Sequence, residues 1–481
     1  MNKNEVAQAA WKGIIWRFLE RCSSQIVSLV VSIILARLLL PEQYGIVAMT
    51  MIFVAISEVF ITSGFGSALI QQAEYDERAF STMFWVSIAF SLLIYTILFS
   101  IAPYISLLMH TPDLTIVLRV LGLRLPISAV NSIQQAYVSQ QMIFRKFFFS
   151  TLSGTISSGI IGLAMAYTGF GVWALVGQNM TMTIVNTAAL HLIIPWRPTL
   201  YFNKKVFYRL YGYSWRSTIT NLIGTTFNYL GDFFIGRYYT SADLAFANRG
   251  NQFPSVIAGN VSATIQTVLF PAFSHLKEDR VLVREAVRKA LMLGSFLVVG
   301  LMAVLAGMAD TVITVILTDK WANSIPYLQW ACLGQCFSIL GMINLQTINA
   351  LGRADIALKL EFIKKPFWFL ALVVGVFISP LAIVAGVAIY GVIAYIINSY
   401  PNEKLLGYGT WQQIKDIIAP FFPAGIVFVI LQLVQDILPH NFMVLFIEGG
   451  LSLIIYFILA RLLHLPGAES FFHLLSGRLR W

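Results

Sequence analysis

Long apolar runs separated by short polar segments occupy most of the chain. A window of about nineteen residues picks out runs that are long enough to cross a bilayer as α-helices. They lie near residues 13–38, 45–70, 82–109, 114–139, 148–168, 171–194, 213–238, 243–270, 287–309, 322–350, 356–378, 380–400, 417–437 and 441–463. We therefore expect an all-α membrane protein of about fourteen transmembrane helices.

Composition agrees with this pattern. Of the 481 residues, 58% are hydrophobic and 11% are charged, and the mean hydropathy is +0.76. A soluble domain carries roughly 25% charged residues, so the composition of this chain excludes a soluble protein. The first apolar run is long enough to span and no small-residue cleavage site follows it, so we expect its helix to be retained.

Lysine and arginine are distributed unevenly between the polar segments. Most of them fall on alternate segments, which are the N-terminal tail, Arg78, Arg145 and Lys146, 196–210, 274–289, 353–365, Lys404, Lys415 and the C-terminal tail. The positive-inside rule places these segments in the cytoplasm. We expect both termini there, and we attribute the net charge of +10 to topology and not to nucleic-acid binding.

Cysteine and histidine offer little chemistry. Cys22, Cys332 and Cys336 all lie in apolar runs, and the i, i+4 spacing of the last two favours packed thiols over a metal pair. None of the six histidines forms a His-Glu-x-x-His motif. We therefore expect no metal site and no cofactor; the shortness of the predicted outer loops separately argues against an enzyme, so we expect no catalytic residue.

The first and seventh runs are similar to each other. Trp16-Arg17 opens the first and Trp215-Arg216 the seventh, while Arg37 and Arg237 close them. Each run also carries a polar stripe on one helix face, formed by Arg17, Arg21, Ser24, Ser28 and Ser32 and by Ser217, Asn221, Thr225, Asn228 and Asp232. We predict two six-helix lobes in pseudo-symmetric repeat, residues 1–210 and 211–400, followed by two extra helices and a cytoplasmic tail in 401–481. Such halves suit alternating access.

Five segments then carry a resemblance that covers nearly the whole chain. They read LARLLLPEQYG (35–45), GFGSALIQQ (64–72), FPAFS (270–274), DKWANSIPYL (319–328) and GRADIALK (352–359). In this order they resemble the Wzx-type polysaccharide flippases, the polysaccharide transporter branch of the MOP exporter superfamily.

The resemblance implies a V-shaped pair of lobes around a cavity that opens to the cytoplasm. It also implies a lipid-linked oligosaccharide on undecaprenyl pyrophosphate as cargo, flipped to the periplasmic leaflet for surface polysaccharide biosynthesis. Membrane lipids, a polysaccharide polymerase and a chain-length regulator are the other expected partners. The family has no invariant catalytic signature. Two alternatives remain: a multidrug-type antiporter of the same superfamily, and a membrane polymerase or glycosyltransferase, which the short outer loops disfavour.

Arginines outnumber acids inside the predicted spans. They are Arg17, Arg21, Arg119, Arg124, Arg216 and Arg249, against Glu20, Glu58, Asp232 and Glu448. Each arginine costs about 2.5 to 3.5 kcal/mol at the bilayer centre. Arg119 and Arg216 lie near span ends, where snorkelling is an equal alternative. We interpret Arg17, Arg21, Arg124, Arg216 and Arg249 as substrate-binding candidates for pyrophosphate and acidic sugars.

Arg124 and Glu58 have the most informative contexts. Ser128, Asn131, Gln135 and Ser139 continue the helix face of Arg124, which favours a cavity wall. Glu58 lies midway along the second run, where it is a candidate for coupling to H⁺ or Na⁺, as is Asp232 in the seventh. The structural alternatives are an Arg17–Glu20 pair within one helix and an ion pair of Glu58 with an arginine of the first or fourth run.

Overall fold

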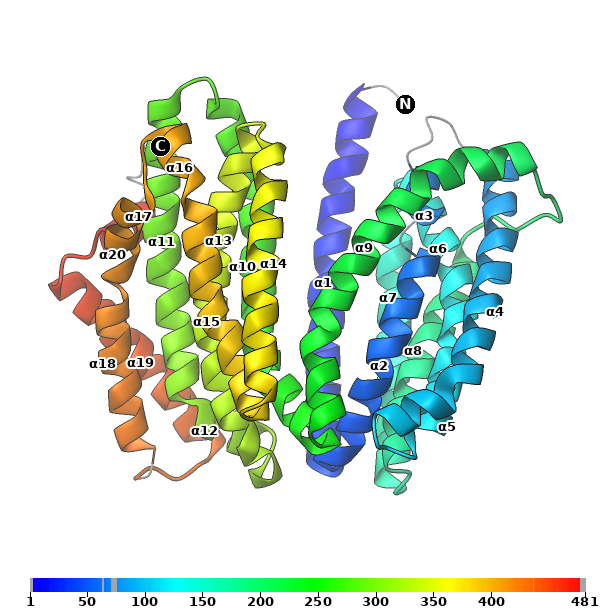
Figure 1. The fold of residues 1–481 in the computed structure, drawn as a ribbon, viewed down its shortest axis with the longest axis horizontal. Coiled ribbons are helices and arrows are strands. Elements are labelled where there is room, and N and C mark those ends of the chain that lie inside the picture. Colours follow the sequence, from blue (N-terminus) through cyan, green and yellow to red (C-terminus); the bar gives the residue numbers. More distant parts are fainter. Residues whose placement is uncertain (1–2, 63–64, 71–75, 436, 476–481) are drawn as a thin grey trace. The chain divides into compact units, whose positions relative to one another are not determined.

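The computed structural model describes residues 3–62, 65–70, 76–435 and 437–475. These residues form α-helices and one short 3₁₀ helix, with no strand among them. The chain divides into two compact units, Met1–Ala245 and Phe246–Trp481, which are described separately (Figure 1).

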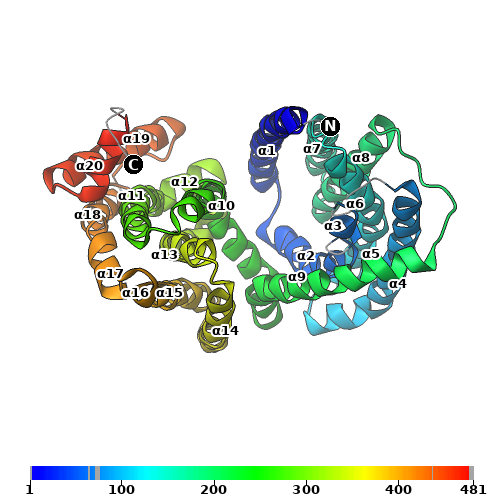
Figure 2. The same ribbon diagram turned by 90° about the horizontal axis from the view of Figure 1, so that it is seen from above.

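The first unit contains α1 (Lys3–Leu38), α2 (Pro41–Thr62), α3 (Phe65–Ile70), α4 (Glu77–Leu108), α5 (Leu114–Gly122), α6 (Arg124–Gln140), α7 (Arg145–Tyr167), α8 (Val172–Ile193) and α9 (Lys204–Tyr238). The helix α10 (Ser241–Leu276) begins in it and continues into the second. Within this unit α1 lies along α7, and α7 packs on α8 (Figure 2). The helices α2, α6 and α8 contact one another in its interior.

A close backbone approach joins the starts of α2 and α10. A Cβ atom on Gly45 would overlap the carbonyl oxygen of Ser241. Only glycine fits such an approach. The glycine that ends the segment LARLLLPEQYG therefore has a packing role.

One predicted run is interrupted. α5 ends at Gly122 and α6 begins at Arg124, and the Leu123 N–H donates to the Val120 carbonyl in the tighter i→i−3 pattern at 3.1 Å. Pro126 has no N–H and its ring crowds the carbonyl of residue i−4, which is Gly122. The sequence itself therefore interrupts the helix next to Arg124.

The second unit contains α11 (Arg280–Gly307), α12 (Ala309–Ile316), η1 (Asp319–Ser324), α13 (Ile325–Ala350), α14 (Ala354–Val376), α15 (Pro380–Ser399), α16 (Pro401–Leu406), α17 (Thr410–Ile418), α18 (Phe421–Val434), α19 (Phe442–Leu462) and α20 (Pro466–Leu475). α11 is its central helix and contacts α13, α17, α18, α19 and α20. The Tyr456 hydroxyl of α19 donates to the Phe296 carbonyl of α11 at 2.7 Å, and its ring lies against Gly300.

A polar network fixes the start of α11 to the α16–α17 turn. Arg288 makes two hydrogen bonds to the carboxylate of Asp416, at 2.8 and 2.9 Å. The Tyr408 hydroxyl donates to the same carboxylate at 2.7 Å. Burial and this hydrogen bond raise the pKa of Tyr408, so the phenol keeps the proton that it donates.

The fold class predicted from the sequence is confirmed. Each of the fourteen predicted runs contains a helix. Among the described residues, ten helices are long and apolar enough to cross a membrane, or eleven if α17 and α18, bent by 42°, form one span. The number of fourteen spans stays a prediction.

The helix ends around the first and seventh runs keep the spacing of the repeat. α1 ends at Leu38 and α9 at Tyr238, while α2 begins at Pro41 and α10 at Ser241, so both ends differ by 200 residues. The predicted boundaries at 210/211 and 400/401 stay predictions.

Candidate functional site

Glu58 and Arg124 meet inside the first unit. Arg124 Nη2 lies 3.6 Å from Glu58 Oε1, and the Ser128 hydroxyl donates to the same oxygen at 2.9 Å. The side chains of Arg124 and Glu58 are 16% and 23% exposed. The ion pair with the fourth run, one of the two sequence interpretations of Glu58, is therefore present.

Arg124 also reaches α8. Its Nη1 lies 3.4 Å from Asn179 Oδ1 and 3.4 Å from the sulfur of Met51. The Nε atom is buried and has no hydrogen-bond partner in the described part of the chain. A guanidinium offers five N–H donors, so Arg124 retains donor capacity for an anion beyond its contact with Glu58.

The predicted polar wall continues along α6. Asn131 accepts a hydrogen bond from Gln135, and Asn131 Nδ2 is buried without a partner among the residues described. Together with Ser128, which holds Glu58, these amides extend the polar surface of α6 away from the ion pair.

The helix α9 brings further polar groups near this pair. Tyr229 and Asp232 lie on α9, which packs directly on α2, the helix that carries Glu58. The two coupling candidates thus lie on neighbouring helices, although they come from runs far apart in the sequence. We call Glu58, Arg124, Ser128, Asn179 and Tyr229 the N-unit polar cluster.

Arg17 has a different environment. It forms the predicted pair with Glu20 at 2.9 Å, and its guanidinium lies 3.7 Å from the centre of the Phe147 ring. Thr151 donates to the other carboxylate oxygen of Glu20 at 2.9 Å. Both partners thus hold α1 against α7.

The exposed candidates Arg21 and Arg216 differ from each other. Arg21 is exposed on α1 and has no side-chain partner among the described residues. The Arg216 guanidinium lies 5.7 Å from the centre of the neighbouring Trp215 ring and is also exposed.

Arg249 belongs to the second unit and is only 8% exposed. It donates to Gln252 and lies 5.5 Å from the centre of the buried Trp321 ring. The five arginines are therefore spread over several environments, and their convergence on one substrate stays a prediction.

Sequence reasoning missed three members of this environment. Met51 and Asn179 contact Arg124 only through tertiary packing, and Tyr229 comes near Glu58 only because α9 packs on α2. Asn179 lies within the apolar eighth helix, and a polar residue in such a context is the one signal that could have drawn attention to it.

A model of the family described as "Polysaccharide biosynthesis protein" matches residues 34–326, more than half of the chain. The chain belongs to this family. The match begins in α1, covers the whole N-unit polar cluster and ends in α13.

Several relatives are similar over most of the chain. The succinoglycan biosynthesis transport protein ExoT of Rhizobium meliloti (strain 1021) is 25% identical over 67% of this chain and 65% of ExoT, just under two thirds of that protein. The teichuronic acid biosynthesis protein TuaB of Bacillus subtilis (strain 168) is 24% identical over 76% of each chain. The lipopolysaccharide biosynthesis protein WzxC of Escherichia coli (strain K12) is 21% identical over 81% of this chain and 80% of WzxC.

Solved structures share the fold. The lipid II flippase MurJ in an inward closed conformation superposes with a TM-score of 0.75 at 15% identity, covering 94% of this chain and 99% of MurJ. A multidrug resistance MATE family transporter of the MOP superfamily, in an inward-facing conformation, gives 0.56 at 14% identity, with 82% and 96% covered. The family match confirms the resemblance to polysaccharide biosynthesis proteins, and these solved structures confirm the fold.

Proposed function

We propose that this chain translocates an undecaprenyl-pyrophosphate-linked oligosaccharide from the cytoplasmic to the periplasmic leaflet of a bacterial inner membrane, for surface polysaccharide biosynthesis. The observation that carries the proposal is the family match over residues 34–326. Relatives named for succinoglycan transport, teichuronic acid and lipopolysaccharide biosynthesis support it, as does a fold shared with a lipid II flippase. A polymerase and a chain-length regulator would act on the exported unit.

The charge distribution of the first unit supports an anionic cargo. Arg124 has an unpaired buried Nε atom, and Arg21 is exposed on a helix that spans by composition. Guanidinium groups bind phosphate and carboxylate through paired hydrogen bonds. In our proposal these two arginines bind the pyrophosphate or the acidic sugars during translocation.

Coupling would use the contact between Glu58 and Arg124. A proton or a Na⁺ ion on the Glu58 carboxylate would neutralise it and weaken its attraction for Arg124, 3.6 Å away. Arg124 would then be available to the cargo. Loss of the ion would restore the pair and favour release, so that the Glu58 carboxylate and the anionic cargo alternate at one guanidinium group. Asp232, on the neighbouring helix α9, is the second coupling candidate.

The proposal is tested by gene deletion and complementation. Surface polysaccharide is measured together with the lipid-linked precursor in the inner membrane, and membrane abundance of the protein is measured in parallel. Loss of polysaccharide with accumulation of the precursor on the cytoplasmic side is the expected result. If the deletion leaves polysaccharide intact and raises sensitivity to cationic drugs, the multidrug alternative replaces the proposal.

Single variants test the coupling residues. We expect Glu58→Gln and Asp232→Asn to impair export at normal abundance, while Glu20→Gln, whose carboxylate joins α1 to α7 outside the N-unit polar cluster, should reduce it much less. Normal export by both of the first two variants would remove these residues from coupling without affecting the assignment of the cargo.

A further inference from the structure

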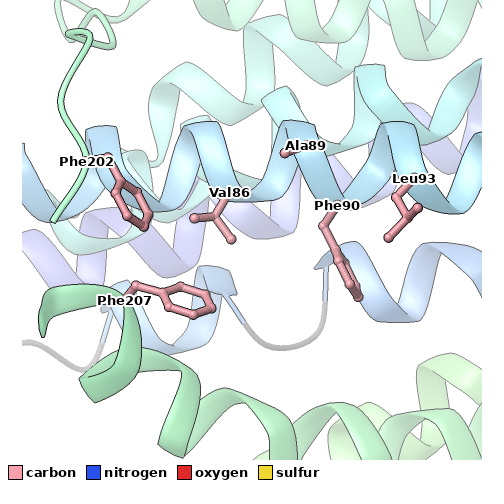
Figure 3. Close-up of a pocket in the computed structure, with 6 residues that line it drawn as sticks. All are labelled: Val86, Ala89, Phe90, Leu93, Phe202 and Phe207. Carbon is pink, nitrogen blue, oxygen red and sulfur yellow. The ribbon is translucent and has the colours of Figure 1, made fainter. Parts of the chain in front are cut away.

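An apolar groove of about 290 Å³ lies in the first unit beside α4, near the start of α9. It is lined by the side chains of Val86, Ala89, Phe90, Leu93, Phe202 and Phe207. Figure 3 shows Val86, Phe90 and Leu93 projecting from α4 toward the side on which Phe207 of α9 lies. Every lining side chain is a hydrocarbon, and Leu93 and Phe202 are 55% and 59% exposed.

Hydrogen bonds hold the segment before α9 against α4. The Trp85 indole donates to the Thr199 carbonyl at 2.9 Å, and the Thr199 N–H donates to Ser81 at 3.1 Å. The Asn203 N–H donates to Thr82 at 3.2 Å. Phe202 is therefore held in position, and the groove is a formed feature of this unit.

Cations surround the start of α9. The segment 196–210 contains Arg197, Lys204, Lys205 and Arg209 and no acidic residue. All four side chains are exposed. Lys204 lies 5.9 Å from the centre of the Tyr208 ring. Aromatic and basic residues combined in this way are typical of helices at the membrane surface.

We propose that the groove seats one acyl chain of an anionic phospholipid of the cytoplasmic leaflet, and that Lys204, Lys205 and Arg209 bind its phosphate. The hydrocarbon lining suits an acyl chain, and the exposed cations suit the negative lipids of that leaflet, to which the charge asymmetry assigns this segment. From Val86 to Leu93 the lining extends about 10 Å along α4. This length accommodates part of one chain.

A phospholipid fits this surface better than the isoprenoid of the cargo does. Lys204, Lys205 and Arg209 lie within six residues at the start of α9, beside a groove whose length suits part of one acyl chain, so that together they match the phosphate and one chain of a phospholipid. The bound lipid would connect the start of α9 to α4. This site lies outside the N-unit polar cluster and does not depend on the proposed cargo.

The test uses the full chain in phosphatidylcholine vesicles that contain phosphatidylglycerol with a diazirine in one acyl chain. After illumination, labelled peptides are mapped by mass spectrometry. We expect label on residues 86–93 and 202–207, at least about tenfold above that from phosphatidylcholine with the same diazirine. Lys204→Gln, Lys205→Gln and Arg209→Gln combined should remove this excess, and Ala89→Trp should abolish labelling by filling the groove.

Matched controls separate the site from general effects. Leu92→Trp places the same ring on an exposed α4 position outside the groove and should leave labelling unchanged. Lys277→Gln, Arg280→Gln and Lys359→Gln combined remove three exposed cations from the second unit and should also leave it unchanged. The proposal would be overturned if both phospholipids labelled the protein equally, or if Ala89→Trp were labelled as strongly as the wild type. It would also be overturned if polyprenyl phosphate displaced the label, because the groove would then bind the isoprenoid chain of the cargo.

Discussion

Glu58 of α2 and Arg124 of α6 form an ion pair, with 3.6 Å between Oε1 and Nη2, in the interior of the first unit. Ser128 fixes the carboxylate and Asn179 contacts the guanidinium. A pair so largely removed from water is costly to break, because either partner left alone is an uncompensated charge.

The first prediction separates the structural role of this pair from its role in transport. Glu58→Gln and Arg124→Gln alone should each lower the free energy of unfolding in detergent by on the order of 3 kcal/mol. The double variant should recover stability, since no unpaired charge remains, and should still fail to export. Normal export by a stable double variant would make the pair purely structural.

The second prediction contrasts two arginines one turn apart. Arg17→Ala removes the contact with Phe147 and the Glu20 pair, and should destabilise the protein by about 1 kcal/mol. Arg21→Ala should change stability by less than about 0.5 kcal/mol and yet impair export. Arg21→Lys should impair it less, because charge remains but the planar donor pair is lost. Wild-type export by Arg21→Ala at normal abundance contradicts its role in binding.

A third prediction concerns Gly45. The Cβ of Gly45→Ala would overlap the Ser241 carbonyl oxygen, so we expect the free energy of unfolding to fall by about 2 to 3 kcal/mol. Gly224→Ala is the matched control within the same unit, since nothing lies within 4 Å of its Cβ position. It should leave the melting temperature unchanged or raise it slightly, as alanine favours a helix. Equal melting temperatures for both variants would refute the close approach.

A fourth prediction ranks the partners in the Arg288 network. Asp416→Ala should cost more stability than Arg288→Ala, because it leaves the buried Tyr408 hydroxyl without the carboxylate that it bonds. Arg288 is 54% exposed, so its removal should cost at most about 1 kcal/mol. Adding Tyr408→Phe should recover part of the Asp416→Ala loss. The reverse ranking in thermal unfolding would contradict this account.

The fifth prediction is topological. The distribution of lysine and arginine places both termini in the cytoplasm. Reporter fusions at residue 481 and at the Asp319–Ser324 segment should therefore give opposite results, cytoplasmic for the first and periplasmic for the second. A periplasmic C-terminus would require an odd number of spans.

Much of the helical architecture was predictable, because a chain in lipid must satisfy its backbone hydrogen bonds within helices. Local pairs were predictable too: the Arg17–Glu20 pair follows from helical spacing and is present. The interruption beside Arg124 was missed. Pro126, four residues after Gly122, is the signal that was available for it.

The partners of the charged residues were harder to predict. Helical periodicity indicates which residues share a face, but not which face meets another helix. Sequence offered Glu58 an arginine of either the first or the fourth run, and the packing of α2 on α6 selects Arg124. Likewise, nothing local connects Arg249 with Trp321, which approach through the fold of the second unit.

The helices α18, α19 and α20 have a consequence for the engineering of this chain. α11 is covered by α18, α19 and α20, and Gly300 and the Phe296 carbonyl accommodate Tyr456 directly. A shortened chain that ends after residue 400 would present that side of α11, with a glycine and its neighbouring carbonyl, to lipid. A minimal version designed without these helices would therefore have to replace the packing that α18, α19 and α20 provide to α11.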